Sequence, residues 1–70
     1  MPSVAISKRE SDCLYFLIQG KSAKEIGRLL NLSYNTIEFY IKRLKAKFQC
    51  HKTSELVSMM ISQNIIKPHI

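Results

Sequence analysis

A chain of 70 residues with a formal net charge of +6 is long enough for one small domain and too short for two. Hydrophobic residues make up 46% of the chain, which excludes a disordered basic tail. A domain of this size has a single layer of packed elements and little room for a deep pocket. The excess of positive charge therefore points to a polyanionic partner.

Membrane insertion and secretion are not indicated by the sequence. It contains no run of 18 apolar residues, and the start MPSVAIS has neither basic residues nor a long hydrophobic stretch. We therefore expect a cytoplasmic protein that does not contact a membrane. Cys13 and Cys50 follow no metal or redox spacing, and each falls in an apolar pattern, so both are expected to be free core residues.

The first helix signal is a capping box formed by Ser7 and Glu10. In this motif the serine oxygen accepts a backbone N–H, and the glutamate reaches back to the N–H of the cap residue. Gly20 can adopt the left-handed conformation that ends a helix, so a helix is expected over residues 8–19. Its inward stripe is expected to consist of Cys13, Leu14, Leu17 and Ile18.

A second capping box, Ser22 with Glu25, predicts a helix over residues 23–30. The segment NLS that follows, residues 31–33, predicts a tight turn, because asparagine tolerates the left-handed conformation and serine can cap the next helix. The inward residues of this second helix are expected to be Ile26, Leu29 and Leu30.

Two further helices are predicted, over residues 34–48 and 53–63, the second starting at Thr53 or just before it. No segment alternates with period two, so no strand is expected. The inward set of the third helix is Ile37, Ile41, Leu44 and Phe48, with Tyr40 at its edge. The inward set of the fourth is Leu56, Val57, Met60 and Ile61.

These elements predict an all-α fold, a four-helix bundle formed by one domain over residues 1–70. Residues 1–6 are expected to be a flexible start, and residues 64–70 a C-terminal extension. The second and third helices, joined by a tight turn, match a helix-turn-helix, whose second helix is shaped to lie in the major groove of DNA.

A stretch of 45 letters in this sequence, ISKRESDCLYFLIQGKSAKEIGRLLNLSYNTIEFYIKRLKAKFQC, resembles the DNA-binding domain of the LuxR/GerE (NarL/FixJ) regulators. The anchors are KRE in the first helix, GKSAKEI across the first turn, and LSYNTIEFYIKRLKAKF over the second turn and third helix. The resemblance spans about residues 6–61. It implies a helix-turn-helix domain that binds promoter DNA and regulates transcription, commonly as a dimer through its last helix, with RNA polymerase as a further expected partner.

The third helix also carries residues that depart from this family. Glu38 stands where most members have lysine, and Tyr40 replaces the usual histidine. The usual glycine after this helix is Gln49 here, and the arginine near the start of the last helix is Thr53, so the resemblance does not predict the turn over residues 49–52.

A helical wheel with Ile37 facing the core separates a predicted reading face, which is expected to contact DNA bases, from the buried stripe. Phe39 lies opposite the core, where it is either a lone surface aromatic or a contact for the methyl group of thymine. Lys42 is expected to donate to guanine O6 or N7. The members of the reading face are Asn35, Glu38, Phe39 and Lys42.

Glu38 leaves two interpretations open. Its carboxylate could accept a hydrogen bond from the cytosine N4 amino group. Alternatively, it could complement the helix dipole and form an ion pair with Lys42, four residues further on.

Phosphate contacts are expected on the rim of the reading face and at the start of the second and third helices. Lys8 and Lys47 are instead interpreted as solvated surface lysines. The expected phosphate-binding residues are Lys24, Ser33, Thr36, Tyr40, Arg43 and Lys45.

Surplus apolar residues on the last helix suggest a two-fold contact, although Ile65 and Ile66 could instead fold back on the core. The expected dimer contacts are Val57, Met59, Met60 and Ile66.

Catalysis is not expected, since four of the five acids fall at predicted helix starts and no acidic pair is left over. His51 and His69 are isolated, so neither a metal nor a cofactor is expected. The rival hypothesis is a protein-interaction module that docks on an acidic partner through Phe39 and Met59. The chain could be a complete regulator or the C-terminal part of a longer one.

Overall fold

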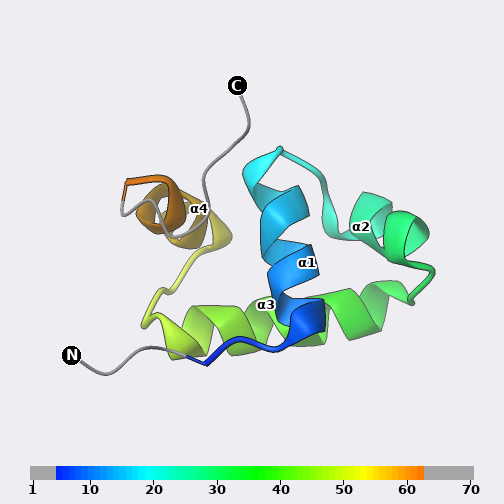
Figure 1. The fold of residues 1–70 in the computed structure, drawn as a ribbon, viewed down its shortest axis with the longest axis horizontal. Coiled ribbons are helices and arrows are strands. Elements are labelled where there is room, and N and C mark those ends of the chain that lie inside the picture. The colour runs from blue at the N-terminus through cyan, green and yellow to red at the C-terminus, as the bar shows by residue number, and fades with distance from the viewer. Residues whose placement is uncertain (1–4, 63–70) are drawn as a thin grey trace.

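A computed structural model describes residues 5–62 of the chain, which form four helices and no strand. The helices are α1 (Lys8–Ile18), α2 (Ala23–Leu30), α3 (Tyr34–Lys47) and α4 (Thr53–Ser62). Figure 1 shows α3 lying beneath the other helices, with α1 standing over its middle and α2 and α4 on opposite sides of α1. The prediction of an all-α fold with a helix-turn-helix is therefore confirmed.

Serine caps begin the first three helices. The Oγ atoms of Ser7 and Ser22 each accept the backbone N–H three residues on, at 3.2 Å, and the glutamate there accepts the serine N–H in return. Ser33 caps α3 in the same way by accepting the N–H of Thr36 at 3.1 Å. Each cap satisfies a donor that would otherwise lack a partner at the start of its helix.

The first three helices end in the same way, with one residue in the left-handed conformation. These residues are Gly20 (φ 88°), Asn31 (φ 58°) and Gln49 (φ 57°). After α3, the N–H of Gln49 donates to the carbonyl of Ala46 at 3.2 Å and that of Cys50 donates to Lys45 at 2.8 Å. This hydrogen-bond pair is a Schellman motif, which closes the helix with its last carbonyls satisfied.

Nine hydrophobic side chains from all four helices form the core. Two residues expected on inward stripes are exposed instead, Leu29 (55%) and Ile61 (44%), because the small domain has no further layer to cover that side of α2 or α4. Cys50 is half-buried against the core, so it only partly matches the expectation for a core cysteine. The core residues are Cys13, Leu14, Leu17, Ile26, Ile37, Ile41, Leu44, Leu56 and Met60.

A close backbone approach joins α2 to the turn before α3 at Gly27, which is buried. A Cβ atom at this position would lie only 2.7 Å from the carbonyl oxygen of Leu32, too close for any side chain without a backbone shift. The N–H of Leu32 donates to the Gly27 carbonyl at 2.8 Å across the same corner. Glycine is therefore needed where the two helices of the helix-turn-helix meet.

None of these helices has the length and apolar character required to cross a lipid bilayer.

Candidate nucleic-acid interface

The four residues of the predicted reading face lie on the exposed side of α3, opposite its buried stripe. Ile37, Ile41 and Leu44 point inward with at most 5% of their surface exposed. By contrast, the Phe39 side chain is 56% exposed, which confirms that it is not a core residue. The exposed members of the face are Asn35, Glu38, Phe39 and Lys42.

Glu38 forms no ion pair with Lys42, although the two residues are four positions apart on one helix. All the ion pairs among residues 5–62 involve Glu10 or Asp12 as the acid. The helix dipole has its main effect within the first turn of a helix, and Glu38 lies beyond the first turn of α3. The interpretation of Glu38 as a partner of Lys42 was therefore wrong, and both charged groups are exposed to a ligand.

The Phe39 ring contacts two side chains of the same helix, Arg43 and Tyr40. The guanidinium carbon of Arg43 lies 5.6 Å from the centroid of the ring, within cation–π range. The Tyr40 ring lies 5.9 Å from it, centroid to centroid, with the planes tilted by 60°. Tyr40 itself is half-buried against the core, so it provides a firm support for Phe39.

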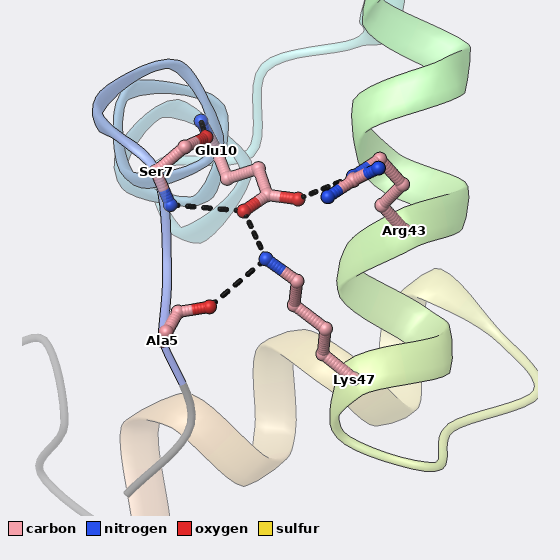
Figure 2. Close-up of polar contacts among 5 residues, drawn as sticks. All are labelled: Ala5, Ser7, Glu10, Arg43 and Lys47. Carbon is pink, nitrogen blue, oxygen red and sulfur yellow. Dashed lines mark hydrogen bonds and ion pairs between the residues drawn. The ribbon is translucent and has the colours of Figure 1, made fainter.

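Arg43 also belongs to a buried ion cluster that joins α3 to α1, shown in Figure 2. The carboxylate of Glu10 is completely buried, and its Oε2 accepts a hydrogen bond from Arg43 Nε at 3.0 Å. Its Oε1 accepts from Lys47 Nζ at 2.5 Å and from the Ser7 N–H at 2.9 Å. We call Glu10, Arg43 and Lys47 the Glu10 cluster.

Lys47 extends this cluster to the segment before α1, because its Nζ also donates to the carbonyl of Ala5 at 2.9 Å. The Lys47 side chain is only 26% exposed. Its interpretation as a solvated surface lysine was therefore wrong, and its physical role is to compensate a buried carboxylate.

The surroundings of Glu10 change its protonation. Burial alone would raise the pKa of this carboxyl group, but the hydrogen bonds from Lys47, the Ser7 N–H and Arg43 outweigh burial and lower the pKa to about 2 from the usual 4.5. Glu10 is therefore ionised at neutral pH, and its negative charge compensates part of the positive charge of Arg43 and Lys47.

The Glu10 cluster was missed by the sequence reasoning, because the capping box alone explains a glutamate at this position. A second signal was present. Glu10 precedes Cys13, Leu14 and Leu17 by three, four and seven residues, so it belongs to the inward stripe of α1. A charged residue on such a stripe requires a buried partner of opposite charge.

Asp12 is one of the four acids that were expected at helix starts, but it lies beyond the first turn of α1. It pairs instead with Lys8 at 3.3 Å and with Arg9 at 3.8 Å on the surface of the same helix.

The residues expected to contact phosphate differ in their exposure. Lys24 is exposed in the first turn of α2, whereas Lys45 is half-buried. The hydroxyl groups of Ser33 and Thr36 lie 2.8 Å apart and are engaged in the cap of α3. At this helix start, backbone N–H groups are therefore more available to bind a phosphate than these two hydroxyl groups.

The expected dimer contacts on α4 are only partly available at the surface. Met60 is completely buried in the core, so its assignment to a dimer interface was wrong. Val57 and Met59 are half-buried against the core, and Ile61 is exposed. Ile66, and the alternative that it folds back on the core, lie outside the described residues.

Within residues 5–62, no three His, Cys, Asp or Glu side chains are grouped closely enough to hold a metal ion.

Comparison with known proteins gives one consistent family. The family model GerE, described as "Bacterial regulatory proteins, luxR family", matches residues 4–60. The putative HTH-type transcriptional regulator y4qH of Sinorhizobium fredii is 33% identical over 63 residues, covering 90% of this chain and 19% of that protein. The transcriptional regulatory protein TdiR of Thauera aromatica is 34% identical over 56 residues, covering 80% of this chain and 25% of that protein.

A solved structure, titled "Crystal structure of the phage VqmA-DPO complex", contains a similar fold. Its TM-score is 0.85 at 36% sequence identity, and the match covers 87% of this chain and 28% of that chain. The present chain thus spans 19% to 28% of the length of these relatives. Because the family model covers most of the chain, this protein belongs to the LuxR family of bacterial regulatory proteins.

Proposed function

We propose that this chain binds double-stranded DNA with α3 in the major groove and thereby regulates transcription. The observation that carries the proposal is a helix-turn-helix whose second helix exposes Asn35, Glu38, Phe39 and Lys42 opposite its buried stripe. An α-helix fits the width of the major groove, and the helix-turn-helix presents its second helix there. Membership of a family of regulatory proteins supports the same reading.

Within this proposal, three residues of the reading face have distinct base preferences. Lys42 donates to O6 or N7 of guanine, and Phe39 contacts the methyl group of thymine. Glu38 accepts from the N4 amino group of cytosine, since its carboxylate has no cationic partner among the described residues.

Phosphate contacts then position α3 without reading sequence. Lys24 provides one from the first turn of α2, and Lys45 and Tyr40 provide others beside the reading face. At the start of α3, the N–H groups of Tyr34 and Asn35 have no acceptor within residues 5–62 and can face a phosphate oxygen.

Pairing on DNA is a further part of the proposal. The half-buried Val57 and the exposed Ile61, four residues apart, give α4 an apolar strip that a second copy could cover, which would match a two-fold operator. The half-buried Met59 flanks the buried stripe of α4 on its other side. Binding to a bacterial promoter would place the protein in the cytoplasm, and a contact with RNA polymerase would follow from transcriptional activation.

The test is duplex binding over a range of salt concentrations. Binding should weaken with salt with a log–log slope of about −0.9 per phosphate neutralised. An operator selected from random duplexes should then bind more tightly than a random sequence of equal length. No affinity for duplex, together with binding to an acidic protein, would favour the protein-interaction module instead.

A further inference from the structure

Arg43 lies between the buried Glu10 carboxylate and the exposed reading face of α3. Its Nε donates at 3.0 Å to Oε2 of Glu10, which is fully buried, yet half of the arginine side chain (52%) is exposed. The same guanidinium lies 5.6 Å from the centre of the Phe39 ring. One planar group thus contacts both the carboxylate on α1 and an aromatic member of the reading face.

The chemistry of arginine suits this double contact. A guanidinium can donate from its edge to a carboxylate while its flat face packs on an aromatic ring, whereas an ammonium is a compact point charge. The Glu10 carboxylate is itself held in place by the Ser7 N–H at 2.9 Å and by Lys47. The position of the Arg43 guanidinium is therefore determined by α1 as well as by α3.

One consequence of these contacts concerns Phe39, and another concerns Arg43. Its ring lies on the exposed face, where an unsupported side chain would sample several rotamers at a cost in entropy when it orders on a ligand. Contacts with Arg43 and with Tyr40 restrict this sampling before DNA is bound. Since the positive charge of Arg43 is already opposed by Glu10, it has less to offer a phosphate than Lys24, which forms no ion pair within residues 5–62.

We propose that Arg43 is a positioning residue for sequence recognition. Glu10 accepts the hydrogen bond from Nε of Arg43 and so fixes the guanidinium, which holds the Phe39 ring ready to contact a base. This inference rests on the proposed function. It replaces the expectation that Arg43 binds phosphate. It also implies that Glu10, on α1, affects sequence specificity although it does not belong to the reading face.

The chain offers a matched pair of substitutions for the test. Arg43→Lys and Lys47→Arg each exchange one cation for another on the same carboxylate, and both preserve net charge. Only Arg43 contacts Phe39. Stability should be measured for both variants by urea unfolding, so that all binding is compared between folded proteins.

Binding is measured for two duplexes, an operator selected from random sequences by the wild-type chain and a random duplex of equal length. For Arg43→Lys, the dissociation constant for the operator should rise about two- to fivefold, the range expected for loss of a cation–π contact, while that for the random duplex stays unchanged. Lys47→Arg should leave the ratio of the two constants as in the wild type. In a Phe39→Ala background, Arg43→Lys should cause no further loss on the operator.

A readout without DNA separates this inference from the proposed function. The ring proton chemical shifts of Phe39 should change in Arg43→Lys and remain in place in Lys47→Arg. Equal loss on both duplexes, full additivity with Phe39→Ala, or unchanged ring shifts would each overturn the positioning role. If the wild-type chain binds no duplex, or binds all duplexes equally, the recognition role fails with it, while the ring shifts still decide whether Arg43 holds Phe39.

Discussion

Two sides of α3 carry charge in different ways. On the reading face, Glu38 and Lys42 are exposed and form no ion pair within residues 5–62. On the side toward α1, Arg43 and Lys47 share one buried carboxylate. The basic residues of one helix therefore have separate roles, and a count of lysines and arginines overstates the charge that is available to a polyanion.

Glu10→Gln should cause the largest loss of stability among single substitutions on either side of α3. At neutral pH the variant leaves Arg43 and Lys47 beside a buried amide that cannot compensate them, and we expect a loss of about 3 kcal/mol. Urea unfolding followed by circular dichroism measures the difference. A loss below about 1 kcal/mol would mean that the Glu10 cluster contributes little to the fold.

The same cluster predicts a pH dependence. Because the pKa of Glu10 is about 2 in the folded chain and 4.5 is its usual value, its contribution to stability is complete above about pH 4.5 and is lost as the pH falls toward 2. The free energy of unfolding of the wild type should therefore decrease across this window. The decrease should be smaller in Glu10→Gln, and parallel curves for the two proteins would contradict the assignment.

Lys42→Ala tests the exposed side. If Lys42 reads a guanine, its loss should cost about 1–3 kcal/mol of discrimination between a selected operator and a random duplex. The fold should be unaffected, since Lys42 forms no ion pair in the described part of the chain and is not part of the core. A variant with unchanged discrimination would remove Lys42 from the reading face.

Lys24→Ala tests whether Lys24 contacts a phosphate or reads a base. A phosphate contact carries no sequence information, so affinity for operator and random duplex should fall by the same factor. The log–log salt slope should also decrease in magnitude by about 0.9. A loss confined to the operator would show that Lys24 contacts a base.

The turn after α3 gives the smallest expected effect. Gln49 adopts a left-handed conformation (φ 57°) that costs an L-residue about 1–2 kcal/mol. Glycine would remove this cost, but its larger unfolded-state entropy would cancel part of the gain in stability. Gln49→Gly should therefore raise the free energy of unfolding by about 0.5 kcal/mol. Gly20→Ala, at the corresponding position after α1 (φ 88°), should lower it instead.

Local signals in the sequence were sufficient to predict most of the fold. The capping boxes, together with Gly20, Asn31 and Ser33, predicted the bounds of α1 and α2 and the start of α3 to within one residue. The apolar stripe predicted the end of α3 with the same accuracy. Glycine, asparagine and glutamine all occupy the same left-handed position, however, and only the first two are recognisable by their own preference. The turn after α3 was therefore not predicted, because glutamine stands at its left-handed position, although the backbone forms it in the usual way.

Long-range contacts were the part that could not be predicted. Arg43 and Lys47 are 33 and 37 positions from Glu10, and no helical period connects residues on different helices. The wheel of α3 placed Phe39 outside the core correctly. It could not show that the neighbouring arginine turns toward α1, because that depends on how the two helices cross.

The corner at Gly27 has a consequence for how such a domain can diversify. At this corner α2 comes so close to the turn before α3 that a Cβ added to Gly27 would lie only 2.7 Å from the Leu32 carbonyl oxygen. No side chain of the reading face takes part in it. This corner is therefore independent of the residues that would read DNA, and a relative could change those exposed residues while the corner stays the same.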